Sequence, residues 1–342
     1  MKKYGVVLIG CGHIGKEHLE EIYDKENIKV IAVIDKNVAL AKEMAEKHGV
    51  SEYAESYEKY LCDDRVDIAI VATYTATHAK ITADFLNKGK HVLCEKPVAP
   101  TLEQGLAFFK TARESNSKAM VAHILRVNRS YIKIKEMIDN GEIGKLLLFR
   151  MAQNQYAADW NRFKCLLQDC TPVLDCGVHY FDVSRWFTGS EFAKISGFKT
   201  KLDADSPNYN YTCVNFELEN GCVGIYEVGW GKNVEQLNLK QFIGEKGRIT
   251  LTLEKDRTDV KGKGDLITVF HGETGILEKI DMPSKYKDMY AQLCYFINVI
   301  EGKTDKNINL NNSEKAFKTA IAGEYAAKTG KTVYFKNGEP IF

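Results

Sequence analysis

The chain has 342 residues, which is too long for one ordinary core and suits two domains. Apolar residues make up 44% and charged residues 27%, a composition that excludes a disordered, collagen-like or coiled-coil protein. With 47 basic and 46 acidic residues the formal charge is +1, so no overall surplus of Lys and Arg favours nucleic acid or an anionic membrane as partner. No 18-residue apolar run occurs, and we expect no transmembrane helix.

The cysteines and the N-terminus bear on the compartment. Nine cysteines are spread along the chain, and none forms the C-x-x-C spacing of a zinc or redox site. We therefore expect no metal site and a reducing, cytoplasmic setting. The segment Leu8–Cys11 resembles a lipoprotein cleavage box, which would imply secretion. The apolar stretch before it, Tyr4–Ile9, is too short for a signal peptide, so we favour the cytoplasm.

Strand-like and helical patterns alternate in the first third of the chain. Buried-strand patterns, apolar and rich in Val and Ile without polar alternation, occur at Tyr4–Ile9, Lys29–Ile34, Asp67–Ala72, His91–Cys94 and Ala119–Ala122. Helical stripes lie between or after them at Ile14–Ile22, Val38–Ala45, Ala79–Leu86 and Thr101–Ser115. Repeated β-α units of this size predict an α/β fold with a doubly wound parallel sheet. Such a sheet binds ligands at the carboxyl ends of its strands.

The period changes after residue 122. Helices are predicted at Tyr131–Asn140 and Thr171–Phe187, and two more at Lys287–Glu301 and Asn312–Thr329, the last capped by Asn311 with Glu314 three residues on. Strand-like stretches at short spacing are Phe192–Lys201, Tyr209–Glu219, Cys222–Val228, Leu237–Ile243, Arg248–Leu253 and Leu266–Phe270. We expect a nucleotide-binding domain over 1–122 and, over 123–342, an α+β domain with a large open antiparallel sheet.

A glycine-rich motif follows the first predicted strand. It matches G-x-G-x-x-G and consists of Gly10, Cys11, Gly12, His13, Ile14 and Gly15. It opens an amphipathic helix, and Asp35 ends the next strand twenty residues after Gly15, which is the context of a dinucleotide site. The alternative is a structural glycine turn. The Asp35 carboxylate suits two ribose hydroxyls and repels a 2′-phosphate, so it favours NAD over NADP as cofactor.

Two further motifs carry a resemblance to a known family. Gly89-Lys90-His91-Val92-Leu93-Cys94-Glu95-Lys96-Pro97 and the stretch Leu174–Tyr180 resemble the Gfo/Idh/MocA family of NAD(P)-dependent sugar and polyol oxidoreductases, which includes inositol dehydrogenases and glucose-fructose oxidoreductases. The resemblance covers nearly the whole chain and implies an N-terminal Rossmann domain. Two departures stand out: Asp169–Pro172 replaces consecutive glycines, and Tyr74-Thr75 replaces the usual Pro-Asn.

The resemblance implies that Lys96, Asp175 and His179 are the catalytic set. The residues themselves suit this role, because Lys96 follows a parallel strand and the other two are four apart on one predicted helix. We expect His179 to transfer the proton, Lys96 to polarise the reacting oxygen, and Asp175 to orient substrate or imidazole. The alternatives are a solvated surface lysine and a helix-face salt bridge. Lys96 as the base stays open.

Further contacts are expected near these residues. The additional cofactor contacts expected are Thr73, Thr75, His78, Glu95 and Lys96 itself; the substrate contacts expected are Arg126, Asn154, Tyr156 and Trp160. Loop capping or packing is the alternative reading of each. His18 lies on the packing face of the first helix, where a core histidine is expected.

These features predict an NAD-dependent dehydrogenase of CH–OH groups in a sugar, inositol-like polyol or sugar derivative. One alternative is a glycosidase that uses NAD transiently, without net redox change. Another is a non-enzymatic NAD(P) sensor, which would need the glycine motif and Asp35 but not the catalytic set. The open sheet has a helix-poor face, so we expect a homodimer or homotetramer.

Overall fold

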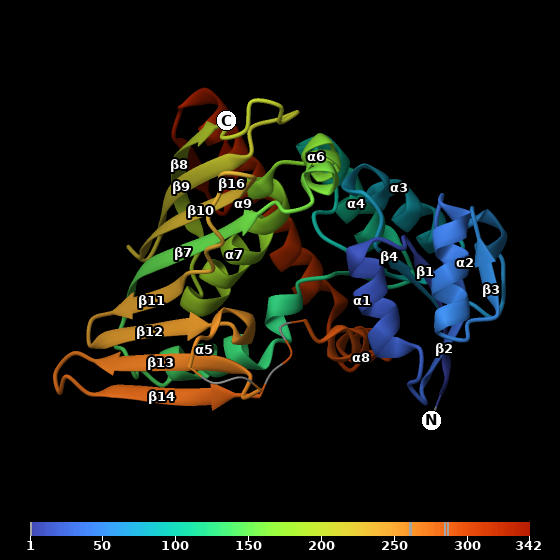
Figure 1. The fold of residues 1–342 in the computed structure, drawn as a ribbon, viewed down its shortest axis with the longest axis horizontal. Helices are drawn as coiled ribbons and strands as arrows, with labels where there is room; N and C mark the ends of the chain where they lie inside the picture. Colours follow the sequence, from blue (N-terminus) through green and yellow to red (C-terminus); the bar gives the residue numbers. More distant parts are fainter. Residues whose placement is uncertain (1, 260–261, 284, 286) are drawn as a thin grey trace. The chain divides into compact units, whose positions relative to one another are not determined.

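The computed structural model describes residues 2–259, 262–283, 285 and 287–342, and the chain forms two compact units. Figure 1 shows its helices and strands in the order of the sequence. The first unit comprises Met1–Ile124 and Asp288–Glu314, and the second comprises Leu125–Lys287 and Lys315–Phe342. Each unit contains one β-sheet.

The first unit is a doubly wound parallel sheet, as predicted. Its strand order is β3-β2-β1-β4-β5-β6, and every neighbouring pair is parallel. The strands are β1 (Tyr4–Ile9), β2 (Ile28–Ile34), β3 (Glu52–Ala54), β4 (Ile68–Val71), β5 (His91–Cys94) and β6 (Ala119–Val121). The order reverses between β1 and β4, and ligands bind at such a switch point, beyond the carboxyl ends of the strands.

Helices complete the first unit. They are α1 (His13–Ile22), α2 (Val38–Lys47), α3 (Thr75–Leu86) and α4 (Leu102–Glu114), together with α8 (Met289–Ile300) from late in the chain. The α8 side chains Leu293 and Phe296 are fully buried in one core cluster with Leu8 of β1 and Leu19 of α1. The predicted second domain, 123–342, differs from the second unit for this reason: the apolar face of α8 packs into the first.

The second unit contains a ten-stranded sheet of order β14-β13-β12-β11-β7-β10-β9-β8-β15-β16, which Figure 1 shows face-on. The pairing is antiparallel except between β7 and β10. The strands are β7 (Leu146–Tyr156), β8 (Phe192–Thr200), β9 (Tyr211–Leu218), β10 (Val223–Gly231), β11 (Lys240–Gly244), β12 (Gly247–Thr252), β13 (Asp265–His271), β14 (Leu277–Met282), β15 (Val333–Lys336) and β16 (Glu339–Ile341). The predicted open antiparallel sheet is therefore largely confirmed.

The helices of the second unit lie against one face of this sheet. They are α5 (Arg129–Asp139), α6 (Trp160–Asp169), α7 (Pro172–Thr188) and most of α9 (Lys306–Thr329). The ring of Tyr180 on α7 stacks on Tyr226 of β10, with centroids 4.8 Å apart. Further along α7, Phe187 packs on Phe242 of β11, with centroids 5.1 Å apart.

The last helix begins earlier than predicted. It starts at Lys306 rather than Asn312, so the capping role predicted for Asn311 is wrong. Asn311 and Glu314 instead accept hydrogen bonds from the guanidinium of Arg113 on α4. A tertiary partner far away in sequence thus accounts for the residues that looked like a local cap. Within the described part of the chain, no helix is long and apolar enough to span a bilayer.

Candidate active site

The carboxyl ends of the parallel strands in the first unit bring the predicted cofactor residues to one edge of the sheet. The glycine motif follows β1, Asp35 follows β2, Thr73 follows β4, and Glu95 and Lys96 follow β5. Because all these strands point the same way, these segments share the edge at which α/β sheets bind ligands. The loops after β1 and β4 flank the switch point itself.

The three motif glycines meet different constraints. Gly10 has a φ of +100°, and a Cβ there would lie 2.3 Å from the carbonyl oxygen of Ala72. A Cβ on Gly15 would lie 1.9 Å from the carbonyl oxygen of Gly10. A Cβ on Gly12 would meet nothing within 4 Å. Two glycines are therefore required by the fold itself, whereas space remains beside the third.

The start of α1 fits a pyrophosphate. Gly12 is the N-cap residue and provides no side-chain hydrogen bond, and the first turn contains no acidic residue. The first N–H groups of the helix therefore remain available to an anion, which the helix dipole also favours. Together with the space beside Gly12, these features show that the loop suits a dinucleotide.

We predict that alanine affects NAD binding at Gly12 and stability at Gly15. Gly12→Ala should fold with a normal melting temperature and bind NAD at least tenfold more weakly, because the new methyl group occupies the space next to the loop amides. Gly15→Ala should lower the melting temperature by several degrees, because its Cβ meets a backbone carbonyl. Differential scanning fluorimetry and calorimetric NAD titration measure both effects. Full NAD affinity in Gly12→Ala would contradict the assignment.

The carboxylate of Asp35 is held by backbone on both sides. One oxygen accepts the N–H of Cys11 at 2.7 Å, and the other accepts the N–H of Asn37 at 2.8 Å. A carboxylate has about four acceptor positions, so both oxygens can still accept hydroxyl groups. The thiol of Cys11 is buried, and burial raises its pKa to about 12, which keeps it protonated and unreactive.

The segment after β5 places Lys96 at the same edge. Lys96 is half-buried, and the peptide bond between it and Pro97 is cis. Glu95 is buried, with one carboxylate oxygen 2.9 Å from Nε2 of His18. His78 is buried as well, and its Nδ1 lies 2.8 Å from the carbonyl oxygen of Pro97. The side chains of Glu95 and His78 thus contact the polypeptide around Lys96.

The remaining cofactor candidates lie at the start of α3 and α1. Thr75 is the first residue of α3 and is buried, while Thr73 is half-buried with its hydroxyl 2.7 Å from that of Thr77. His13 is exposed and pairs with Glu17 at 3.2 Å, one helical turn on. The His13 side chain therefore points along the surface of α1, whereas its backbone lies in the anion-binding turn.

Asp175 and His179 occupy the first half of α7 in the second unit. Thr171 caps this helix by accepting the N–H of Leu174 at 3.4 Å, and Pro172 begins it. The sequence that replaces the expected glycines therefore works as a helix start. Asp175 and His179 are both half-buried, and because they are four residues apart they project from the same face.

Arg126 binds the same helix. Its guanidinium donates to both carboxylate oxygens of Asp182, at 2.7 and 2.9 Å, and lies over the ring of Trp186 at 5.3 Å. Asp182 is 1% exposed and follows His179 by three residues. This bidentate pair neutralises the buried carboxylate of Asp182, which lies one helical turn after His179. The structure therefore shows Arg126 as a partner of α7.

The register of the sheet places two of the expected substrate contacts on the other face. Met151 pairs with Tyr226, which packs under α7, so odd-numbered residues of β7 face the helices. Asn154 and Tyr156 are even-numbered and face away from α7. Asn154 donates to Glu227 at 2.9 Å on that face, and Tyr156 is 57% exposed. The expected contact of these two residues with a site on α7 is therefore not supported.

The same register points to Gln153 and Gln155 instead. They pair with Val228 and Trp230 of β10 and are half-buried on the helix-covered face. α7 crosses the sheet and moves toward the start of β7 as it does so. Tyr180 packs on Tyr226 of β10, which pairs with Met151, whereas Phe187 packs on Phe242 of β11, which pairs with Phe149. The first turns of α7 therefore lie toward the end of β7 that carries these glutamines. Strand alternation, counted from a known buried neighbour, is the signal that identifies them.

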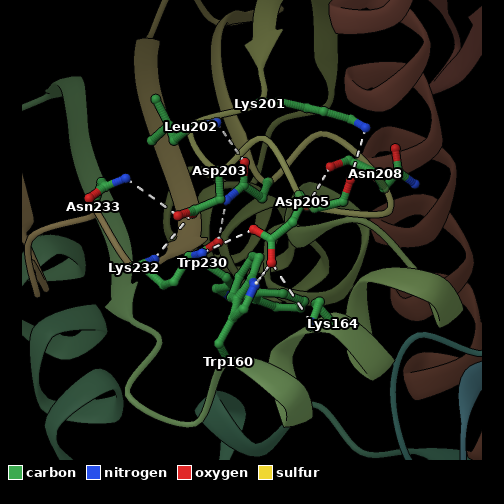
Figure 2. A network of polar contacts seen from close by, with 12 residues as sticks. Trp160, Lys164, Lys201, Leu202, Asp203, Asp205, Asn208, Trp230, Lys232 and Asn233 are labelled. Atoms are coloured by element: carbon green, nitrogen blue, oxygen red, sulfur yellow. Dashed lines mark hydrogen bonds and ion pairs between the residues drawn. The ribbon is translucent and has the colours of Figure 1, made fainter.

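Trp160 belongs to a polar network at the start of α6. Figure 2 shows its indole N–H directed at Asp205, with an N–O distance of 2.8 Å. The ammonium of Lys232 also binds Asp205, at 3.0 Å, and lies 5.3 Å from the centre of the Trp160 ring. The hydrogen bond from Trp160 is the main cause that lowers the pKa of Asp205. Trp160 thus anchors α6 to the loop between β8 and β9.

Within the described ranges, no three His, Cys, Asp or Glu side chains gather as a set that could hold a metal ion.

A Rossmann sheet with a fitted dinucleotide loop and a second unit carrying candidate acid–base groups together define a nucleotide-dependent oxidoreductase. Two family models match the chain: an oxidoreductase family with an NAD-binding Rossmann fold over residues 4–123, and the GFO/IDH/MocA C-terminal domain over residues 131–250. The chain belongs to the Gfo/Idh/MocA family of oxidoreductases.

Curated relatives span the same length. The chain is 26% identical to scyllo-inositol 2-dehydrogenase (NAD(+)) from Bacillus subtilis, over 98% of this chain and 94% of the relative. It is 24% identical to myo-inositol 2-dehydrogenase from Thermotoga maritima, over 83% of this chain and 84% of that protein.

Solved structures share the fold. The structure of myo-inositol 2-dehydrogenase from Lactobacillus plantarum superposes with a TM-score of 0.82 at 20% identity, over 98% of this chain and all of the other. Aldose-aldose oxidoreductase from Caulobacter crescentus gives a TM-score of 0.85 at 18% identity, with the same coverage. These likenesses confirm the two-part architecture.

Proposed function

We propose that this chain is an NAD-dependent dehydrogenase that interconverts a ring hydroxyl and a carbonyl in a sugar or an inositol-like polyol. The single observation that supports the proposal most is that a loop suited to a dinucleotide, Asp35 and Lys96 occur together at one edge of the first sheet. Family membership and the inositol dehydrogenases among the relatives support the substrate class. When bound, NAD accepts the hydride that leaves the carbinol carbon.

Side chains of this protein then remove the hydroxyl proton and stabilise the oxygen that loses it. His179 removes the hydroxyl proton as the C–H bond breaks, because an imidazole suits proton transfer near neutral pH. Lys96 donates a hydrogen bond to the same oxygen and stabilises negative charge that develops on it. Asp175, one helical turn before His179, accepts hydrogen bonds and orients the substrate or the imidazole. Lys96 belongs to the first unit, and Asp175 and His179 belong to the second.

Gln153 and Gln155 are proposed to bind hydroxyl groups that do not react. Each amide offers two donors and an acceptor, which matches a polyol that presents both. They lie on the face of β7 that α7 covers, at the end toward Asp175 and His179. A glutamine-to-leucine change at either position should raise KM more than it lowers kcat.

A cofactor-reduction screen tests the proposed reaction. NAD is mixed with the protein and a panel of polyols, sugars and aryl glycosides, and absorbance is followed at the NADH band. The proposal predicts NADH formation with at least one polyol or sugar. Release of the aryl group without net NADH would instead indicate a glycosidase with transient redox. NAD binding without turnover of any compound would indicate a sensor.

The preference for NAD is proposed from Asp35. Asp35→Asn keeps an oxygen that can accept one backbone N–H but removes the negative charge that opposes a 2′-phosphate. We expect NAD to bind about tenfold more weakly and NADP at least tenfold more tightly, since a hydrogen bond to a charged group is worth about 1.5–3 kcal/mol. Fluorescence titration with both cofactors measures this. NADP binding the unmodified protein as tightly as NAD would contradict the preference.

Self-association and a cytoplasmic setting are proposed as well. The sheet face opposite α7 exposes the apolar side chains of Ile225 and Phe198, at 47% and 60%, on strands two positions apart in the sheet. A second copy covering this face would remove them from water, giving a dimer or a tetramer. Light scattering that shows a monomer at micromolar concentration would contradict this. None of the nine cysteines is in a disulfide, which supports a reducing compartment.

A further inference from the structure

Two buried histidines contact the residues on either side of Lys96. The segment Glu95-Lys96-Pro97 follows β5. His18, from α1, lies against Glu95, and His78, from α3, lies against Pro97. Because α1 follows β1 and α3 follows β4, the segment that contains Lys96 is contacted by two separate helices within the first unit.

The first contact is a buried pair. Nε2 of His18 lies 2.9 Å from a carboxylate oxygen of Glu95, and the two side chains are 0% and 11% exposed. Because the carboxylate accepts, the proton of this bond is on Nε2. Among the described residues, Nδ1 of His18 has no hydrogen-bond partner, so the ring serves no other polar group there. Burial of a carboxylate is costly without such a partner.

Glu95 transmits this contact to the backbone of Lys96. Its other carboxylate oxygen accepts the N–H of Lys96 at 3.3 Å. Its own N–H donates to the carbonyl oxygen of Val71 at the end of β4, at 2.9 Å. The chain from His18 through Glu95 therefore fixes the point at which Lys96 leaves the sheet.

The second contact joins two loops at the cofactor edge. Nδ1 of His78 faces the carbonyl oxygen of Pro97 at 2.8 Å, and Nε2 faces the carbonyl oxygen of Thr73 at 3.0 Å. His78 is 1% exposed, so its ring lies wholly inside the unit. One side chain thus connects the segment after β5 to the loop after β4, which flanks the switch point of the sheet.

We propose that His18 and His78 are positioning residues, which hold the backbone of Lys96 so that its amine meets the reacting oxygen. The proposal rests on the proposed function, in which Lys96 acts on that oxygen. Glu95 then has a structural role rather than the expected cofactor contact, because its carboxylate faces His18 and the N–H of Lys96. A displacement of about 1 Å at a catalytic group costs about 100-fold in rate, so the effect should be large.

The test compares five variants with the unmodified protein, four built around His18 and His91 and one at His78. His18→Leu removes the partner of Glu95, whereas His18→Gln retains an N–H near the position of Nε2. Glu95→Gln in the His18→Leu background removes the buried charge. His91→Gln is the matched control, because Nδ1 of His91 accepts the N–H of Lys118 at 2.9 Å at the opposite end of the same strand.

We expect His18→Leu to lower kcat by about 10- to 100-fold while the Kd for NAD stays within threefold. His18→Gln should recover to within about fivefold of the unmodified protein, and the added Glu95→Gln change should cost little more. His78→Leu should show the same split between kcat and NAD binding. Unchanged kcat in folded His18→Leu, or an equal loss in His91→Gln, would overturn the proposal.

A second readout does not depend on turnover. Acetic anhydride acetylates the amine of Lys96, and peptide mass spectrometry follows the rate in the absence of NAD. This rate reports the position and accessibility of the amine directly. We expect this rate to change severalfold in His18→Leu and to remain unchanged in His91→Gln; equal rates in His18→Leu and the unmodified protein would overturn the inference. If no polyol is oxidised but the Lys96 rate still responds to His18, the proposed function fails and the positioning of Lys96 stands.

Discussion

Lys96→Met is expected to lower the rate of hydride transfer by at least 1,000-fold while NAD binds within threefold of its normal affinity. The amine supplies a hydrogen bond to an oxygen on which charge develops, and such groups contribute about 100- to 10,000-fold. Lys96 is half-buried and methionine has a similar length, so the fold should tolerate the change.

The measurement combines single-turnover kinetics, NAD titration and a matched control. Lys90→Met changes a lysine in the same motif, whose ammonium donates to the carbonyl oxygen of Asp63 at 2.9 Å. That variant should retain its turnover within a few-fold. If Lys96→Met keeps more than a tenth of the normal rate, Lys96 does not have the proposed role.

Lys240→Met is expected to stabilise the second unit by about 4 kcal/mol at pH 7.5. Lys240 is fully buried on β11 beside Met151, and its ammonium has no hydrogen-bond partner among the described residues. Burial, the largest cause, lowers its pKa from 10.5 to about 7, although Asp256 and Asp265 act in the opposite direction. Desolvation therefore outweighs these charges and the nearby ring of Tyr180, whose centre is 5.6 Å away.

The pH dependence of this effect has a definite sign. Above pH 10.5 the lysine is neutral in both folded and unfolded chains, and it costs nothing. As the pH falls toward 7, the unfolded chain takes up a proton that the folded chain does not, so the lysine increasingly disfavours folding. The gain from Lys240→Met should therefore shrink to about 1 kcal/mol at pH 9.5.

Urea denaturation at pH 7.5 and 9.5 measures both values. Lys279→Met, at an exposed position on β14, is the control and should change stability by less than about 0.5 kcal/mol. A gain that does not depend on pH would show that burial does not lower the pKa of Lys240, and a loss of stability in Lys240→Met would show that the lysine is charged and favourably placed.

Local patterns were sufficient to predict the first unit. The motif from Gly10 to Gly15, Asp35 and the segment around Lys96 each combine a strand end with residue types whose chemistry depends on near neighbours in sequence. The parallel, doubly wound arrangement follows from the same β-α repeats, whereas the strand order comes from the structure. The strands β3, β7, β14, β15 and β16 were not among those predicted, and the open antiparallel sheet of the second unit was predicted only in kind.

Long-range contacts account for what could not be predicted. Asn154 and Gln155 are adjacent, and only the pairing of β7 with β10 shows which of them faces α7. The core position of Phe296 depends on α1, which lies more than 270 residues earlier in the chain. The pair of His18 and Glu95 joins residues 77 apart. None of these contacts has a local signature.

The most direct test of the account follows the transferred atom. Carbon-deuterated polyols are incubated with the protein and NAD, and the cofactor is analysed by mass spectrometry. We expect the cofactor to gain one deuterium as the matching ketone appears in equal amount, and we expect Lys96→Met, with NAD still bound, to give neither. Consumption of substrate with no deuterium in the cofactor would contradict it.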